Sequence, residues 1–230
     1  MKSLLTLTLI LPILLTANGC GQLTQSKAKA LDIEPNSPRN IVIVLDATRS
    51  WPFWSEAIER IKREIAMGGL KETDASLTLI LITNRNFRLP APIAEKIPIS
   101  KAKNGEMNID FLRVRNRILA KLDELTVHPP NLPAGTDLLG ALYEAQDVLK
   151  DCEAGEEWLL IFSDLGDTVG REIELNFDGA IVRCFYVPPQ GNITRFEKLV
   201  KDWSDRFLNW QASSVQIYNP TASRRHRLLE

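Results

Sequence analysis

Five oxygen-bearing side chains fall at places where they could hold a divalent cation. Asp46, Thr48 and Ser50 stand at alternate positions in "LDATRS", directly after an apolar run. Side chains at alternate positions of an extended turn can point the same way, so these three can face one point. Thr136 in "PAGTDLL" and Asp164 in "LLIFSD" supply two more oxygens. With a few waters, such a set makes the hard-oxygen octahedron that Mg²⁺ or Mn²⁺ prefers.

Apolar runs predict the strands that must position these residues. Each run is short, continuous and rich in β-branched residues, which is typical of strands buried on both faces. The runs are residues 40–47, 75–84, 156–164 and 180–188, with a shorter edge strand expected at 214–220. Residues 93–100 could form another edge strand, where prolines are tolerated.

Between these runs, apolar residues recur with a helical period. Such stripes begin at Trp54, Phe111, Leu138 and Ile193. Strands that alternate with helices predict an α/β domain, with a Rossmann-like, open and mostly parallel sheet and helices on both faces. In such a sheet, ligands bind where loops leave the carboxyl ends of the strands. We therefore expect the five oxygen-bearing side chains to meet there.

The order of these pieces resembles the von Willebrand factor A family and its metal-ion-dependent adhesion site. That family carries D-x-S-x-S after the first strand, a Thr before a middle helix, and an Asp that ends the fourth strand. Here "DATRS", "GTD" and "FSD" stand in the same order. The resemblance implies that Thr48 and Ser50 bind the metal directly. It also implies that Asp46 and Asp164 act largely through water or as nearby charges. Thr136 would be a ligand in at least one state.

Departures from the family pattern set this chain apart. Thr48 replaces a serine, which adds a methyl group beside the metal, and Leu165 follows the second aspartate where the family usually has glycine. Arg49 places a positive charge beside the metal, where it could oppose cation binding or hold an acidic partner. Trp51 and Phe53 are candidates, together with Arg49, to contact a partner near the metal.

The resemblance implies a non-enzymatic protein-binding module. A carboxylate of a partner protein would complete the Mg²⁺ coordination in a charge-assisted contact. No paired nucleophile and base surrounds the predicted site, so we expect neither catalysis nor a small-molecule substrate. The 28 Lys and Arg residues balance 29 Asp and Glu, which gives no reason to expect nucleic acid. Zinc-type Cys and His spacings are absent from the sequence.

Two other functions stay open. The chain also resembles the haloacid dehalogenase phosphatases, in which Asp46 would attack phosphate and Thr83 would hold it. Asp164 and Asp167 would then bind Mg²⁺. However, Thr48 stands where that family has an acid–base aspartate, and a hydroxyl cannot take that role at neutral pH. The other alternative is a metal-free structural subunit of an envelope complex, which would bind through aromatic surface alone.

The N-terminus indicates export. Residues 1–19 contain a basic start and a twelve-residue apolar stretch, too short for a bilayer span of about 20 residues. Cys20 resembles the lipobox cysteine of bacterial lipoproteins. We expect a lipoprotein anchored in an envelope membrane and facing the periplasm or the cell exterior, with a soluble secreted protein as the alternative. Residues 20–38 would be a tether, residues 39–220 the von Willebrand A-like domain, and residues 221–230 a mobile basic tail.

Some of these residues also have ordinary structural uses. Ser50 and Thr136 could each cap a helix N-terminus. Cys152 and Cys184 could pair in an oxidising compartment, although Cys184 lies in a predicted strand and could equally be a small buried hydrophobe. The convergence of five oxygen-bearing side chains on one crevice is what favours a metal site over these local uses.

Overall fold

The computed structural model describes most of the chain beyond the N-terminal region. The described residues are 37–84, 90–98, 108–130, 134–151, 155–189 and 191–230. The predicted signal segment, most of the tether with Cys20, and Cys152 lie outside them. None of the helices in these described ranges is long and apolar enough to cross a membrane.

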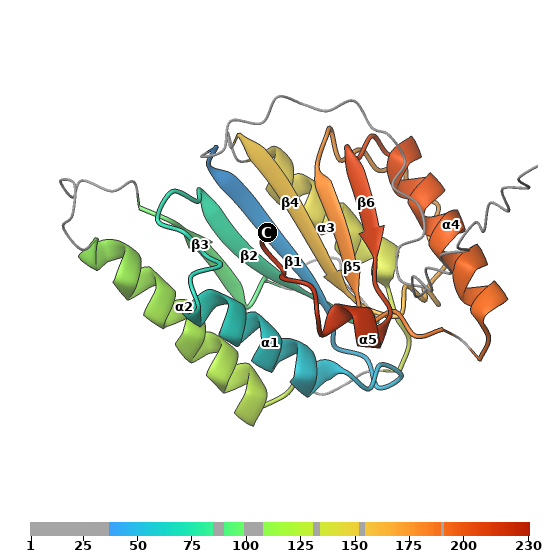
Figure 1. The fold of residues 1–230 in the computed structure, drawn as a ribbon, viewed down its shortest axis with the longest axis horizontal. Helices are drawn as coiled ribbons and strands as arrows, with labels where there is room; N and C mark the ends of the chain where they lie inside the picture. Colours follow the sequence, from blue (N-terminus) through green and yellow to red (C-terminus); the bar gives the residue numbers. More distant parts are fainter. Residues whose placement is uncertain (1–36, 85–89, 99–107, 131–133, 152–154, 190) are drawn as a thin grey trace, which may run out of the picture.

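A six-stranded sheet forms the centre of an α/β fold (Figure 1). The strands are β1 (Arg39–Asp46), β2 (Ser76–Ile82), β3 (Ile93–Lys96), β4 (Glu156–Phe162), β5 (Ile181–Phe185) and β6 (Ser214–Ile217). Their order is β3-β2-β1-β4-β5-β6, and every neighbouring pair is parallel except β2 and β3, which are antiparallel. The α/β class and the mostly parallel sheet predicted from the sequence are confirmed.

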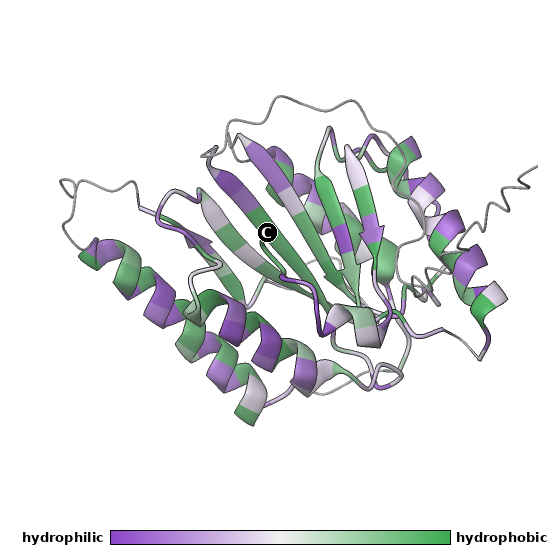
Figure 2. Cartoon of the chain, viewed as in Figure 1, coloured by the Kyte–Doolittle hydropathy of each residue, from purple (hydrophilic) through white to green (hydrophobic). Residues whose placement is uncertain are grey.

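Helices cover both faces of this sheet. They are α1 (Trp54–Ala66), α2 (Ile109–Val127), α3 (Leu138–Lys150), α4 (Ile193–Asn209) and the short α5 (Pro220–Ser223). Figure 2 shows hydrophobic residues concentrated on the strands, with hydrophilic stripes along α1 and α2. The four long helices coincide with the predicted stripes, because each stripe is the face that the helix buries against the sheet.

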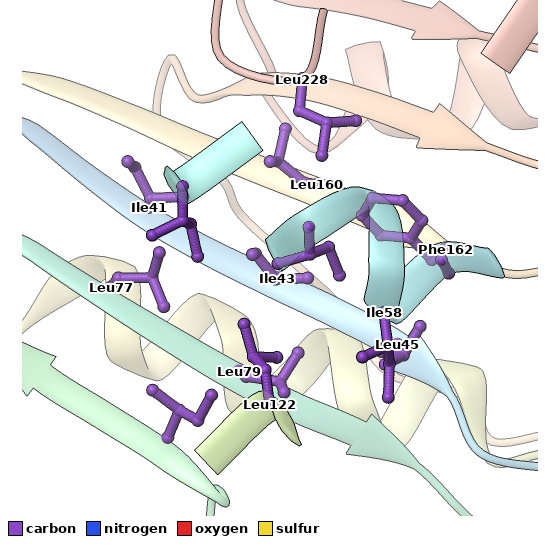
Figure 3. Packing of buried hydrophobic residues seen from close by; sticks show 14 of the residues in the cluster. Ile41, Ile43, Leu45, Ile58, Leu77, Leu79, Leu122, Leu160, Phe162 and Leu228 are labelled. Carbon is purple, nitrogen blue, oxygen red and sulfur yellow. The ribbon is translucent and has the colours of Figure 1, made fainter. Parts of the chain in front are cut away.

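Strand β1 lies at the centre of the core and contributes side chains to the hydrophobic clusters on both faces of the sheet. All eight of its residues are buried. Ile41, Ile43 and Leu45 point into the cluster shared with α1 and α2 (Figure 3), whereas Val42 and Val44 point into the cluster shared with α3 and α4. Such alternation follows from the two-residue period of a strand. A strand buried on both faces holds its carboxyl end rigidly, and this is where the candidate site begins.

The C-terminal segment, residues 221–230, is packed rather than mobile, so the prediction of a mobile tail is wrong. Leu228 and Leu229 are 1% and 5% exposed and join the cluster of α1 and α2. Figure 1 shows the chain end lying over β1 and β4, beside α1, and Figure 3 places Leu228 against Leu160. The segment covers apolar sheet surface that α1 and α2 leave open, which is why its two leucines bury.

Two arginines of the sheet, Arg39 and Arg183, bind this segment as well. Arg39 donates to the carbonyl oxygen of Leu229 at 2.8 Å and forms an ion pair with buried Asp74 at 2.7 Å. Arg183 donates to the carbonyl oxygen of Leu228 at 3.1 Å. These bonds join both guanidinium groups to the backbone of the segment and fix its position over the sheet.

Cys184 is a free thiol in the interior of β5. It is fully buried within the cluster formed with α3 and α4, and this burial raises the pKa of its thiol. Of the two uses predicted for Cys184, the small buried hydrophobe is therefore the correct one.

Candidate metal site

The Asp46 carboxylate lies at the carboxyl end of β1 and is held by three hydrogen bonds. Its Oδ1 accepts from the backbone N–H of Thr48 at 2.9 Å and from the Thr48 hydroxyl at 2.6 Å. Its Oδ2 accepts from the hydroxyl of Ser163 at 3.0 Å. Asp46 is only 1% exposed. The chain therefore fixes a desolvated carboxylate at the end of the central strand.

Three hydroxyl oxygens line up beside this carboxylate. Thr48 Oγ1 lies 3.1 Å from Ser50 Oγ and 3.5 Å from Thr136 Oγ1. Neighbouring oxygens of an Mg²⁺ octahedron lie about 2.9 Å apart, because each Mg–O bond is about 2.0–2.1 Å. Thr48 and Thr136 are buried, whereas Ser50 is exposed. The Thr48–Ser50 spacing is thus close to that of an octahedral edge, and the Thr48–Thr136 spacing is wider. The group is open to solvent on the Ser50 side.

Asp164 brings a second negative charge to the same end of the sheet. Adjacent parallel strands β1 and β4 run in register, with Leu45 opposite Phe162, so the residues that follow them leave the sheet together. The pKa of Asp46 is raised, first by burial and further by the charge of Asp164, although hydrogen bonds from Thr48 and Ser163 act in the opposite direction. A bound cation would offset the free-energy cost of burying the Asp46 charge and the repulsion of that charge by Asp164.

The donor set itself fits a hard cation. Within the described ranges, no three His, Cys, Asp or Glu side chains form a group that could hold a metal ion. The arrangement at Asp46 is of another kind, with two carboxylates and three hydroxyls, and carboxylate and hydroxyl oxygens suit Mg²⁺ or Mn²⁺. The residues present therefore fit such an ion.

The capping alternative for the two hydroxyls is wrong. Helix α3 is capped by Asp137, whose carboxylate accepts from Gly140 N–H at 3.1 Å. Helix α1 has Phe53 at its N-cap position, with no side-chain capping bond. Because neither cap uses Ser50 or Thr136, both hydroxyls stay available to the site.

The loop after β4 positions Thr136. Thr168 accepts a hydrogen bond from the Thr136 N–H at 2.7 Å, and its own N–H donates to the Thr136 carbonyl at 2.9 Å. Asp137, fully buried, forms an ion pair with Arg171 of the same loop at 2.9 Å. Sequence reasoning missed Thr168, because only the folded loop brings it to Thr136.

Asp167 has a structural use in the same loop. Its Oδ1 accepts from Leu138 N–H at 2.9 Å, at the N-terminus of α3, and its Oδ2 accepts from Gly170 N–H at 2.8 Å. A carboxylate at a helix N-terminus is favoured by the helix dipole. The phosphatase alternative needs this carboxylate for a metal, and the observed bonds give that assignment no support.

Ser163 and Leu165 are further residues that sequence reasoning did not assign a role. Ser163 is completely buried, donates to Asp46 and accepts from the Leu165 N–H at 3.1 Å. Leu165 has a φ of 61°, in the left-handed region that favours glycine. A leucine thus adopts here a backbone conformation that glycine takes without strain. The Leu165 side chain is 3% exposed, and its burial offsets part of the backbone strain, about 1–2 kcal/mol.

The aromatic residues after the site divide between core and surface. Trp51 is only 2% exposed, and its ring lies 5.9 Å from that of Phe53 and 6.4 Å from that of Tyr186. The prediction that Trp51 contacts a partner is therefore wrong for this conformation, because its side chain fills space beneath the loop. Arg49 is exposed and forms no ion pair in the described part of the chain, and Phe53 is half-buried.

Comparisons with known proteins show a likeness of fold. No family model and no curated protein matches the chain. Among solved structures, the pilus adhesin SpaC from Lactobacillus rhamnosus GG, in its open conformation, has a TM-score of 0.52 at 11% identity, over 84% of this chain and 29% of that one. The PilB minor pilin from Streptococcus sanguinis, in a mutant form, has a TM-score of 0.49 at 11% identity, over 89% of this chain and 61% of that one. The chain thus covers less than two thirds of either protein.

Proposed function

We propose that this chain is a von Willebrand A-like, divalent-metal-dependent protein-binding module without enzymatic activity. The observation that carries the proposal is the row of three hydroxyls, spaced at 3.1 and 3.5 Å, beside the buried carboxylate of Asp46. The likeness in fold to a pilus adhesin supports a binding role at the bacterial cell surface. The chain would reach that surface through export and a lipid anchor on Cys20.

Different residues of the proposed site bind the cation, supply negative charge and contact the partner. The Thr48 hydroxyl donates its proton to Asp46, so its oxygen lone pairs can bind a cation. The oxygens of Ser50 and Thr136 lie next to it. Asp46 and Asp164 supply the negative charge that attracts the cation. A bound Mg²⁺ would supply a positive charge for an incoming carboxylate. Exposed Arg49 adds a second positive group for the same acidic partner.

Thr48→Val is expected to weaken Mn²⁺ binding at least tenfold. Valine keeps the shape of threonine but removes the oxygen at the centre of the hydroxyl row, and with it the 2.6 Å hydrogen bond to Asp46. Isothermal titration of Mn²⁺ into the purified protein measures the affinity. Thr78→Val, the same change at a buried position of β2, is the matched control and is expected to bind Mn²⁺ as the wild type does.

The same pair of variants tests the binding role itself. Affinity capture from bacterial membranes is expected to enrich a partner with the wild type and with Thr78→Val in Mg²⁺. The partner should be lost with Thr48→Val or with a chelator. Equal Mn²⁺ affinity of Thr48→Val and wild type, or a partner retained in chelator, would contradict the proposal.

Cys20→Ser is expected to abolish acylation of the chain in cells. Only the thiol of Cys20 can form the thioether of a lipoprotein anchor, and serine removes it at almost unchanged size. Metabolic labelling with a clickable fatty acid, followed by gel fluorescence, measures the anchor. Labelling of Cys20→Ser at the wild-type level would refute an anchor at this residue.

A further inference from the structure

A groove rich in arginine runs between α1 and the C-terminal segment. It encloses about 450 Å³, and five arginines from the two sides line it, namely Arg60, Arg63, Arg224, Arg225 and Arg227. We call it the arginine groove. Figure 1 shows α1 and α5 side by side at this place. Its size lies within the range of ordinary small-molecule sites, about 300–1,000 Å³.

The glutamates that line the arginine groove already have basic partners. The pairs are Glu56 with Arg224, Glu59 with Lys62, and Glu64 with Arg227, at 2.7, 2.8 and 3.1 Å. Arg60, Arg63 and Arg225 line the groove without an ion pair in the described part of the chain, although the charge of Arg60 acts on nearby Glu56. Five arginines against three glutamates leave the lining of the groove with two excess positive charges.

These three arginines differ in how they are held. Arg60 is fixed, because it donates to the carbonyl oxygen of His226 and its guanidinium lies 5.4 Å from the ring centre of Phe185 and 5.9 Å from that of Tyr186. Arg63 and Arg225 are exposed, one from α1 and the other from the C-terminal segment. The fixed guanidinium of Arg60 can position a ligand, and the exposed guanidinium groups of Arg63 and Arg225 can contact it from opposite sides of the groove.

The excess positive charge, and the number of guanidinium groups outside ion pairs, indicate the charge of the ligand. One guanidinium fork suffices for a single carboxylate. Three around one cavity suit an oxyanion with at least two negative charges and more than two acceptor oxygens, which describes a phosphate group.

We propose that the arginine groove binds a phosphate-bearing ligand, with Arg60, Arg63 and Arg225 as its cationic contacts. The same chemistry occurs in free phosphate compounds and in the headgroups of anionic phospholipids. The groove is separate from the proposed metal site, because its lining contains none of the five residues of that site. Binding there requires no divalent cation.

The test measures binding of inorganic pyrophosphate by isothermal titration, at low ionic strength because salt screens exposed charges. EDTA is present, so that no metal at Asp46 can hold the probe. The wild type is expected to bind. Arg63→Gln/Arg225→Gln is expected to bind at least tenfold more weakly. Arg113→Gln/Arg195→Gln removes two exposed arginines from α2 and α4, keeps the same net charge as the first double variant, and is expected to stay within twofold of the wild type.

A vesicle arm distinguishes the two sources of phosphate. Sedimentation with phosphatidylglycerol–phosphatidylcholine vesicles, compared with phosphatidylcholine alone, uses the same three proteins. Loss of vesicle binding in Arg63→Gln/Arg225→Gln alone assigns the groove to headgroups, and pyrophosphate binding without vesicle binding assigns it to a free phosphate compound.

Three results would overturn the proposal. They are no pyrophosphate binding by the wild type, equal affinities of the two double variants, and tighter binding of a short poly-glutamate peptide than of pyrophosphate. Both substituted residues are exposed, so the fold should survive, and circular dichroism verifies this. If the glutamine pair does not fold, Arg63→Lys/Arg225→Lys replaces it and is expected to bind several-fold more weakly, because lysine lacks the bidentate fork.

Discussion

Asp46→Asn is expected to abolish the stabilisation of the protein by Mg²⁺ and, in the same experiment, to stabilise the metal-free protein at neutral pH. At an Mg²⁺ concentration a hundred times its dissociation constant, binding stabilises the wild type by about 2.7 kcal/mol. For a domain of this size, that corresponds to a rise in melting temperature of about 5–10 °C. Without the carboxylate charge, this rise should disappear.

The metal-free protein should respond in the opposite direction. Burial raises the pKa of Asp46 and the charge of Asp164 raises it further, so the ionised carboxylate destabilises the folded state when no cation is present. Asparagine removes that charge at almost the same size. Its oxygen can accept from Thr48, and its amide can donate to the Ser163 oxygen, which reverses the direction of that bond. We therefore expect Asp46→Asn to melt above the wild type in EDTA at pH 7.

The pH dependence follows from the same shift. A carboxyl group whose pKa is raised by folding binds its proton more tightly in the folded state. Metal-free wild type should therefore lose stability as the pH rises from the ordinary carboxyl value, about 4, through the raised pKa of Asp46. This component of the loss should be missing from Asp46→Asn.

Melting curves by circular dichroism from pH 3.5 to pH 8, in EDTA and in Mg²⁺ at constant ionic strength, test these expectations together. Asp202→Asn, at an exposed position of α4, is the control with the same change in charge and is expected to follow the wild type. A wild type without an Mg²⁺ response, or an Asp46→Asn variant that keeps one, would remove the basis for a metal site.

Leu228→Ala is expected to lower the free energy of unfolding by about 2–5 kcal/mol, the usual range when a buried leucine is truncated. Leu228 is 1% exposed and packs in the cluster of α1 and α2. Its carbonyl oxygen also accepts from the half-buried guanidinium of Arg183, so loosening of the segment would leave that group with one hydrogen bond fewer.

Urea unfolding followed by tryptophan fluorescence measures this loss. Thr221→Ala, an exposed position of the same C-terminal segment, is expected to change stability by less than about 0.5 kcal/mol. Wild-type stability of Leu228→Ala would mean that residues 221–230 are a mobile tail in solution.

Strands and helices of this chain are predictable because their signals are local. β1 is a continuous run of buried residues with few polar interruptions, and the stripe from Trp54 to Ile65 repeats with the period of a helix. The same locality explains why Asp46, Thr48 and Ser50 were predicted to face one point, since their spacing is a property of six neighbouring residues. Thr136 joins them because chain order and parallel strands limit where α3 can begin.

Tertiary structure alone decided the remaining features. Ser163 and Thr168 became visible as supports of Asp46 and Thr136 only when the loop after β4 was placed beside β1. Asp137, not the neighbouring threonine, caps α3, and Trp51 turns inward; local sequence permits either choice in both cases.

The C-terminal segment shows the physical reason most clearly. By itself "SRRHRLL" is a charged stretch with two leucines, typical of a solvated tail. Its burial depends on sheet surface that α1 and α2 leave uncovered, and on Arg39 and Arg183, which lie far away in sequence. Local patterns therefore determined which elements form and which oxygens point together. Contacts between distant residues determined which groups support the site, which aromatic side chain is buried, and where the C-terminal segment packs.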